Sequence, residues 1–479
     1  MKWNFSPIVL SMFLLLPLSS AAQFAGAPGA CGGDEAGAES RSKAALKAEL
    51  KAELLDEIRA ELAAEAQAAA CAESKRADRP SRLTVGGYGE AVMTRNFYSD
   101  NYLRYISPDT YRDDKSHGRF DLPHVVVYLG YDFGRGWSMG TEIEFEHGGT
   151  ESAFETEFEE GGEYESEVER GGEVALEQFW IQKSFCRALN LRMGHLIVPV
   201  GATNMHHMPT EFFGVYRPEG ENTILPCTWH ETGVGLWGEI GKWRYEALFL
   251  PGLDSDRFGN DAWIASGAGS PYEFKIGNAY AGAFRVDNFS VRGLRLSVSG
   301  YAGNTFSNTL SYNRNKGSFK DVKGTVLLGS FDFLYDARGW VIRGNFDYGH
   351  LSDSGLITSF NKGMTSASPS PRQSVGSDAV ATGLEAGFDF FSCSRKLHGQ
   401  GQRLYLFGRY EYYDSMYKTD AKVMREEWCG RQRVAVGLNY YPIKNIVVKA
   451  EYAVGILKSP FYNEPSLSLG IAYSGLFKR

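Results

Sequence analysis

The chain has 479 residues, of which 55 are Gly, 17 are Pro and 14% are aromatic, and its formal net charge is -8. A negative charge argues against a nucleic-acid-binding protein, which normally presents a basic face. No run of apolar residues beyond residue 22 is long enough for a membrane-spanning helix, which excludes a helical membrane protein. Six Cys residues are too few for a disulfide scaffold in a chain of this length.

Residues 1–22 have the pattern of a secretory signal peptide. Lys2 supplies a positive charge, residues 8–18 are apolar but too short to span a bilayer, and small residues stand at 20–22. A buried N-terminal helix is the alternative interpretation. We expect this segment to be removed and the protein to leave the cytoplasm.

Three segments of different composition follow. Residues 23–42 are rich in Gly, Ala, Ser and Glu, which predicts a flexible leader. Residues 43–72 are rich in Ala, Glu, Lys and Leu and lack Gly and Pro, which predicts a helix, and residues 73–82 form a polar linker. The apolar residues of the helix recur at three- and four-residue spacing, which favours a self-associating coiled coil over a solvated spacer.

From residue 83 onward, apolar and polar residues alternate. Trp340, Ile342 and Phe346 fall on one face of such a segment, and Arg343 and Asp347 fall on the other. A period of two predicts strands with one apolar and one polar face. We predict sixteen strands, at 83–95, 120–133, 136–148, 172–184, 189–198, 230–240, 243–250, 276–286, 294–303, 321–334, 340–348, 380–390, 402–413, 431–441, 446–454 and 466–477.

Short and long connections alternate strictly between these strands. Turns such as 134–135 and 241–242 alternate with long stretches such as 149–171, 199–229, 251–275 and 349–379. A soluble sandwich has no reason to sort its connections by side, whereas a transmembrane β-barrel does. We therefore predict an all-β fold, a 16-stranded antiparallel transmembrane β-barrel over 83–479, preceded by the helical coiled-coil segment. A barrel of this size leaves a water-filled channel.

Charged residues recur on the strand faces opposite the apolar ones. A packed core does not tolerate unpaired charges, whereas a hydrated lumen does. Because both signs are present, the sequence leaves cation or anion selectivity open. The predicted lumen charges are Glu142, Glu144, Arg192, Arg244, Arg343, Arg409 and Glu411.

The connection from about 148 to 172 is a run of Glu residues with one Arg. Because like charges repel one another, we predict a solvated, mobile external loop. Weak binding of Ca²⁺ or Mg²⁺ is the alternative, although the regular Asp and Gly spacing of a calcium loop is missing.

The stretch after the fifth strand is apolar and contains several Pro residues, which favours packing over exposure to solvent. A third loop that folds into the lumen would narrow the pore. The pattern in this stretch consists of Gly194, Pro199, Gly201, Asn204, His207, Pro209, Phe213, Glu221, Pro226, Trp229, Glu231, Gly233 and Gly235.

Together with the barrel layout and the helical leader, this pattern resembles the phosphate-selective porins of the O and P type. The resemblance implies a sixteen-stranded trimeric porin whose third loop folds inward. Phosphate selectivity in that family is tied to rows of lumen Arg and Lys. This chain is acidic and mixes Glu with its lumen Arg residues, so we do not extend the phosphate selectivity of that family to this chain.

No metal, cofactor or catalytic set is predicted. The adjacent residues His206 and His207 point in different directions and lack the His-Glu-x-x-His spacing, which favours a structural or pore-lining role. No local signature selects a nucleophile, a base and an orienting acid, so we do not predict an enzyme.

Four of the six Cys residues lie in the predicted barrel and follow its two sides. Cys186 and Cys393 fall in predicted turns, and Cys227 and Cys429 fall in predicted external loops. Disulfide pairing within each side stays open, because the compartment is oxidising.

We therefore expect an outer-membrane porin of a Gram-negative-type bacterium, with the helix in the periplasm. The expected partners are small hydrophilic solutes or ions, outer-membrane lipid and further copies of the chain in a homotrimer, with no cofactor and no nucleic acid. Two alternatives stay open: an adhesin or surface-binding barrel with a closed lumen, and a barrel-embedded enzyme. The predicted constriction consists of Asn204, His207, Glu211 and Arg217.

Overall fold

The computed structural model describes residues 82–478, except 115, 147–151, 159–163, 171–173, 271–273, 310–313, 315, 367 and 369. Contacts divide the chain into two compact units, and the second, Arg82–Arg479, is the unit described below. The predicted signal peptide, leader and helix, and nearly all of the linker, lie outside the described residues.

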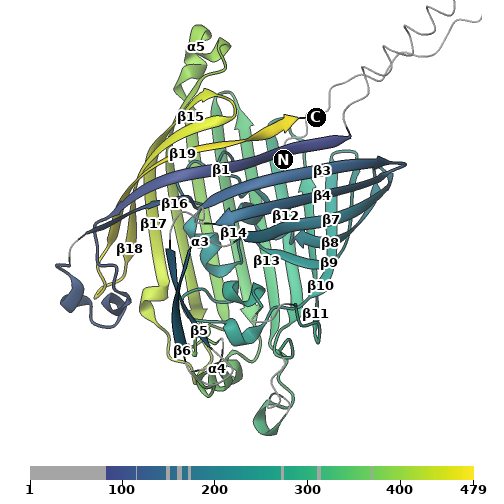
Figure 1. Cartoon of the computed structure of the whole chain (residues 1–479). Helices are drawn as coiled ribbons and strands as arrows, with labels where there is room; N and C mark the ends of the chain where they lie inside the picture. Colours follow the sequence, from purple (N-terminus) through teal and green to yellow (C-terminus); the bar gives the residue numbers. More distant parts are fainter. Residues whose placement is uncertain are drawn as a thin grey trace, which may run out of the picture. The chain divides into compact units, whose positions relative to one another are not determined.

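The described unit is a closed antiparallel β-barrel (Figure 1). Wall strands pair in chain order, and β1 closes the ring by pairing with β19, for example Asn96 with Ser466. The wall consists of β1 (Leu83–Asn96), β2 (His117–Asp121), β3 (His124–Gly134), β4 (Trp137–Glu146), β7 (Val174–Cys186), β8 (Leu189–Ile197), β9 (His230–Ile240), β10 (Trp243–Pro251), β11 (Tyr280–Asn288), β12 (Leu294–Asn304), β13 (Thr325–Ala337), β14 (Trp340–Leu351), β15 (Asp378–Asp389), β16 (Arg403–Lys418), β17 (Gly430–Ile443), β18 (Ile446–Leu457) and β19 (Glu464–Lys478).

Two of these strands, β2 and β3, occupy one position in the wall. Both pair with β1, β2 along Val92–Asn96 and β3 along Leu83–Gly89. The break between them contains Pro123, which has no backbone N–H to continue the ladder. The predicted count of sixteen wall strands is therefore confirmed, and each predicted segment overlaps one of them.

Tight turns gather at one end of the barrel. Residues 135–136 and 338–339 each connect two strands, and Arg135 and Arg338 both adopt φ 56°. Positive φ values at such turns match the twist of the strands that they join. The connection between β15 and β16 is longer and carries η7 (Phe390–Cys393) and α5 (Arg395–Gly399), which Figure 1 shows at the top.

Long loops gather at the other end. The connection between β4 and β7, predicted to be a solvated, mobile acidic loop, contains a hairpin of β5 (Ser152–Phe158) and β6 (Tyr164–Arg170) that forms a separate sheet. The other loops contain η1 (Tyr102–Tyr105), η2 (Pro108–Tyr111), α2 (Ala202–Met205), α3 (Glu219–Ile224), η4 (Ser255–Arg257), η5 (Ala265–Ala268), η6 (Gly317–Phe319), α4 (Ser354–Lys362) and η8 (Glu427–Cys429).

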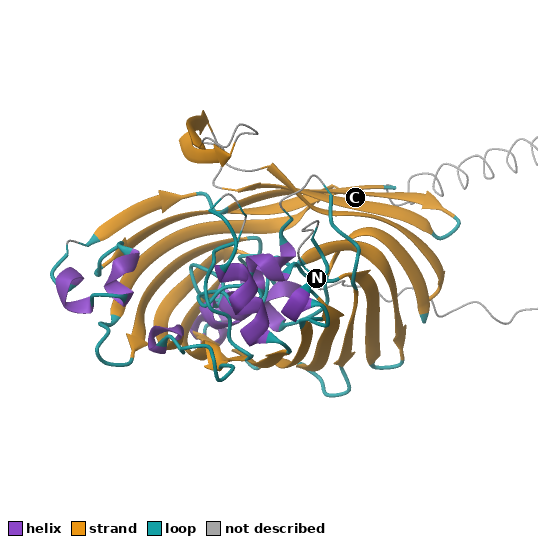
Figure 2. Ribbon diagram, turned by 90° about the horizontal axis from the view of Figure 1, so that it is seen from below, coloured by secondary structure: helices purple, strands orange, loops and turns teal. Residues whose placement is uncertain are grey.

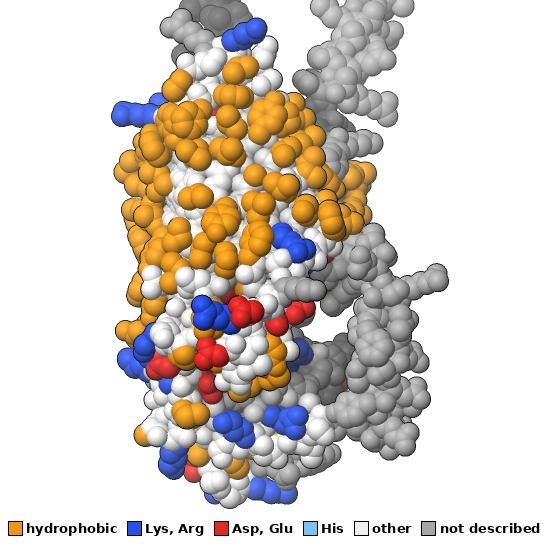
Figure 3. Space-filling view, turned by 90° about the vertical axis from the view of Figure 1, so that its left-hand side faces the viewer, with side chains coloured by type: hydrophobic (Ala, Val, Ile, Leu, Met, Phe, Trp, Pro, Cys, Tyr) orange, Lys and Arg blue, Asp and Glu red, His pale blue; other side chains and the backbone are white. Residues whose placement is uncertain are grey.

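The outer surface of the wall is apolar. Outward-facing side chains such as Met193, Leu384 and Ile471 are more than half exposed, at 55%, 52% and 52%. Figure 3 shows apolar side chains covering the wall, with charged side chains gathered toward the loop end. None of the helices in the described parts of the chain has the length and apolar character needed to cross a lipid bilayer.

Several loops fold back into the barrel, so the lumen contains a hydrophobic core. Figure 2 looks at the loop end and shows helices inside the ring of strands. Trp229, Trp263, Ile264, Phe306 and Ile357, which come from four different loops, are fully buried in one cluster with wall residues. The route through the barrel is therefore decided by how these loops attach to the wall.

Candidate functional site

The third loop, residues 198–229 between β8 and β9, is closed at its neck by Asn204. The side-chain nitrogen of Asn204 donates to the carbonyl oxygen of Val198 at 2.6 Å, and its oxygen accepts from the backbone nitrogen of Trp229 at 2.6 Å. Asn204 is only 1% exposed. This predicted constriction residue therefore joins the two ends of the loop.

Within the third loop, Glu221 connects α3 to α2. One carboxylate oxygen of Glu221 accepts from the backbone nitrogen and the hydroxyl of Thr203, at 3.0 and 2.7 Å. A Cβ atom at Gly201, where φ is 85°, would lie 2.0 Å from the other oxygen, so the chain needs a glycine there. Burial, followed by the charge of Asp347, raises the pKa of Glu221 well above its ordinary value.

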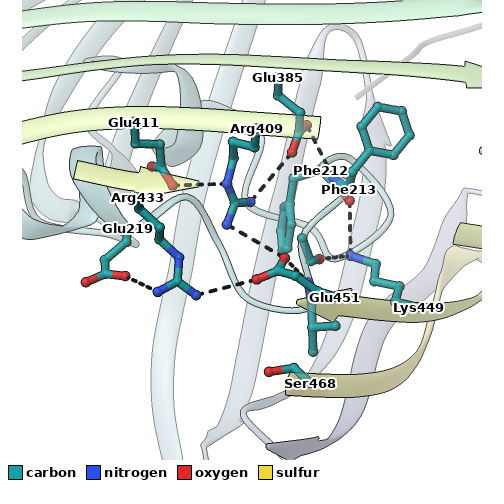
Figure 4. Close-up of polar contacts among 12 residues, drawn as sticks. Phe212, Phe213, Glu219, Glu385, Arg409, Glu411, Arg433, Lys449, Glu451 and Ser468 are labelled. Carbon is teal, nitrogen blue, oxygen red and sulfur yellow. Dashed lines mark hydrogen bonds and ion pairs between the residues drawn. The ribbon is translucent and has the colours of Figure 1, made fainter. Parts of the chain in front are cut away.

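The middle of the third loop, residues 212–220, is attached to β15–β18 by side chains that bond its backbone. We call these wall residues the clamp: Glu385, Glu411, Asn439, Lys449 and Glu451. The carboxylates accept from the nitrogens of Phe213, Val215 and Gly220 at 3.3, 3.2 and 2.9 Å. Lys449 donates to the carbonyls of Phe212 and Gly214 (Figure 4). Asn439 donates to the carbonyl of Phe213.

Arg409 lies at the centre of the clamp and is 5% exposed. Its guanidinium nitrogens lie 3.0 Å from Glu411, 3.6 Å from Glu385 and 3.8 Å from Glu451. A Cβ atom at Gly214 would lie 2.3 Å from a guanidinium nitrogen of Arg409 and 2.6 Å from the backbone oxygen of Tyr216, so a glycine lets the loop pass this close.

Two more arginines complete this network. Arg433 pairs with Glu219 at 2.7 Å and with Glu451 at 3.5 Å. Arg343 pairs with Glu385 at 2.6 Å, and its guanidinium carbon lies 5.0 Å from the ring centre of Phe213. The structure therefore brings together the predicted lumen charges Arg343, Arg409 and Glu411.

Beyond β19, the next part of the wall is acidic. We call its five inward carboxylates, contributed by β1, β4 and β7, the acidic wall: Glu90, Glu142, Glu144, Glu146 and Glu177. Glu144 and Glu177 are 2% and 1% exposed. Nδ1 of His124 lies 2.8 Å from Glu144, and the Tyr88 hydroxyl donates to Glu177 at 3.2 Å.

The third loop turns His207 and Arg217 toward the acidic wall. Nε of Arg217 donates to the carbonyl oxygen of His207 at 3.3 Å, and Nε2 of His207 lies 4.0 Å from Glu177. Burial opposes the charge of Arg217, but its neighbours, first Cys227 and Tyr88 and then Glu177, raise the pKa of this guanidinium above its ordinary value. These two predicted residues thus meet the predicted lumen charges Glu142 and Glu144.

The remaining predicted residues lie apart from this contact. The Glu211 side chain is 22% exposed and pairs with His206 at 3.3 Å. Arg192 donates to Gln182 at 2.8 Å, and Arg244 pairs with Glu246 at 2.6 Å and with Asp287 at 3.4 Å. Both arginines lie near the ends of their strands that adjoin the tight turns.

Sequence reasoning missed Glu177. The predicted alternation along β7 puts residue 177 on the outward face with Phe179, which is 42% exposed. A register shift opposite Glu142 and Ile143 breaks that alternation, and Glu177 is buried. Such a bulge re-aims a side chain locally and leaves no clear mark in the pattern of apolar residues.

Comparisons with known proteins leave the family open. No family model matches the chain. An uncharacterized protein of Aquifex aeolicus is 26% identical over 395 residues, which are 80% of this chain and 77% of that protein. The predicted resemblance to phosphate-selective porins is not confirmed by these comparisons.

Solved structures of outer-membrane proteins align with most of the chain. An anion-selective porin from Comamonas acidovorans has a TM-score of 0.47 and 9% identity, over 82% of this chain and 99% of its own. The outer membrane channel DcaP of Acinetobacter baumannii has a TM-score of 0.45 and 11% identity, over 83% and 98%. OmpT of Vibrio cholerae has a TM-score of 0.43 and 12% identity, over 83% and 99%.

Proposed function

We propose that the protein is an outer-membrane porin through which small hydrophilic solutes or ions diffuse passively. The observation that carries this proposal is the distribution of side chains on the barrel wall, which is apolar on the outside and charged on the inside. Outward side chains such as Leu384 are apolar and exposed, whereas inward ones such as Arg409 and Glu411 are charged. A barrel that spans a lipid bilayer and encloses water requires this arrangement.

The third loop forms the constriction in this proposal. Its middle is attached to β15–β18 by the clamp, so we place the passage on its other side, along the partly exposed side chains next to the acidic wall. His124 is 18% exposed there, and His206 and Glu211, toward the tight-turn end, are 27% and 22% exposed. The passage would therefore be narrow and polar.

The charge along this passage favours cations. The acidic wall contributes five carboxylates, and Arg217 is the cation of the third loop that interacts with three of them, Glu90, Glu144 and Glu177. In a narrow pore, a ring of carboxylates selects for cations. Removing Arg217 should strengthen this preference.

Current through the purified, refolded protein in a planar bilayer under a salt gradient tests the proposal. Discrete conductance steps with a reversal potential of the cation-selective sign would support it. A heat-modifiable, β-rich barrel that passes no current would contradict it and would favour a surface-binding protein with a closed lumen.

We further propose a homotrimer whose periplasmic helix, residues 43–72, aids assembly. Conductance steps that recur in groups of three would support the trimer. Deletion of residues 43–72 should lower the stability of the trimer on a semi-native gel, because the apolar stripe of the helix would lose its partners. An unchanged trimer would leave the segment as a spacer.

A further inference from the structure

Three side chains from distant parts of the chain meet where the third loop faces the acidic wall. Glu142 comes from β4, Glu177 from β7 and His207 from the third loop, and one ligand atom of each lies within 4.8 Å of the other two. This separation is larger than that of ligands around one bound ion, but side-chain rotation alone could close it.

The hydrogen bonding of His207 leaves one ring nitrogen available. Nδ1 lies 2.9 Å from the carbonyl oxygen of Asn204, and a carbonyl can only accept, so Nδ1 carries the proton. In the neutral ring, Nε2 then presents a lone pair, and it faces the Glu177 carboxylate at 4.0 Å, beyond hydrogen-bond distance. His207 is 7% exposed, so little water can occupy this gap.

Neutral donors orient both carboxylates. Glu177, 1% exposed, accepts from the Tyr88 hydroxyl at 3.2 Å and from the Thr228 hydroxyl at 2.7 Å, and Gln178 donates to Glu142. Neutral donors hold a carboxylate in place without cancelling its charge. Together with the carbonyl behind His207, they form the kind of outer contacts that orient metal ligands.

We propose that Glu142, Glu177 and His207 bind a divalent transition-metal ion at the contact between the third loop and the acidic wall. An imidazole nitrogen with two carboxylates suits ions such as Zn²⁺, Co²⁺ or Ni²⁺ better than alkali ions. Nε of Arg217 bonds the His207 carbonyl, and the positive charge of Arg217 opposes the binding of a cation. The two negative charges of Glu142 and Glu177 outweigh this single positive charge. The binding itself does not depend on the proposed channel, whereas an effect on current does.

Metal binding by the full-length, untagged protein, refolded in detergent, tests the site directly. Titration with Zn²⁺ in a calorimeter and the absorption spectrum of added Co²⁺ should both report one strong site per chain. His207→Ala and Glu177→Gln should weaken binding by at least about tenfold, because each removes a ligand. Glu142→Gln, at a less buried position, provides a second test if either variant fails to fold.

Two matched variants locate the site. His206→Ala removes the neighbouring imidazole, which pairs with Glu211 instead, and should leave the affinity unchanged. His124→Ala changes a nearby group of His124, Glu144 and Glu146 and should also leave it unchanged. A Co²⁺ spectrum that persists in His207→Ala, or disappears only in His124→Ala, would overturn the assignment.

Recordings of the current through a bilayer distinguish the proposed metal site from the proposed channel function. Zn²⁺ at micromolar concentration should lower the current of the wild-type protein and leave that of His207→Ala unaffected. Current without Zn²⁺ binding would overturn the metal site and keep the porin. Zn²⁺ binding to a protein that passes no current would support the site and contradict the porin.

Discussion

The backbone nitrogen of Gly220 lies 2.9 Å from a carboxylate oxygen of Glu411, although 191 positions separate the two residues. Four further wall residues bond the backbone of the third loop in the same region. Backbone groups of a loop inside a barrel must find partners when water is excluded. The charges of β15–β18 therefore hold the third loop in place and are not free to attract solutes.

Replacing Arg409 with Ala should release the third loop. The change leaves Glu385, Glu411 and Glu451 buried without their shared cation, and breaking such a pair costs about 3–5 kcal/mol. We expect a lower urea midpoint in detergent and a larger single-channel conductance. Arg187→Ala is the control, because this exposed pair with Glu239 contributes about 0–1 kcal/mol. Equal stability of the two variants would contradict the clamp.

Replacing Arg217 with Ala should shift the reversal potential further toward cations. The change removes a positive charge that faces Glu144 and Glu177 of the acidic wall. Arg217→Lys keeps the charge and should leave the reversal potential near that of the wild type. If the reversal potential of Arg217→Ala is unchanged, Arg217 does not belong to the constriction.

The four described cysteines should differ in their reaction with a maleimide at pH 8. All four are free thiols, and Cys186 and Cys393, near the tight turns, are exposed. Burial raises the pKa of Cys227 and of Cys429 to about 12. A pKa this high leaves roughly a thousandfold less thiolate than an ordinary thiol has.

Mass spectrometry should therefore find the label on the two exposed cysteines and, only after unfolding, on the buried ones. Unfolded thiols lose their protons near pH 8.5, whereas the folded Cys227 and Cys429 keep theirs, so stability should fall as the pH rises above about 8.5. Rapid labelling of folded Cys227, or a disulfide between Cys227 and Cys429, would contradict the packing of these loops.

Replacing Leu384 with Arg should destabilise the barrel in lipid vesicles by about 2–4 kcal/mol, because a charge on the lipid face loses its water. Leu384 is 52% exposed on the outer wall. Met424→Arg is the control, since Met424 is 76% exposed in a loop and stays in water. Unfolding by urea compares the two variants. A tolerated Leu384→Arg would indicate that the outer wall does not face lipid.

The wall could be predicted from the sequence because lipid outside and water inside impose a period of two on every strand. Residues such as Ile342 and Arg343 carry that signal locally, without reference to the rest of the chain. The hairpin of β5 and β6 is not predicted from the sequence, because repulsion among the Glu residues of this loop favours a solvated segment over paired strands.

The site was less predictable than the wall. The sequence predicts a constriction of Asn204, His207, Glu211 and Arg217, and in the structure Asn204 closes the neck of the third loop. Its role depends on where Val198 and Trp229 meet, which no local pattern shows. The clamp likewise pairs residues that lie far apart along the chain, and no periodic pattern in the sequence indicates such pairs. Only the folded barrel identifies the partners of Lys449.

The clamp also bears on how the barrel is assembled. The third loop precedes β15–β18 in the chain, and all five clamp residues are contributed by these late strands. A barrel that is still open between β1 and β19 and lacks its last strands has no clamp to hold the middle of the loop. The narrow passage is thus completed at the end of insertion, and a truncated or stalled intermediate would leave a wider hole in the membrane.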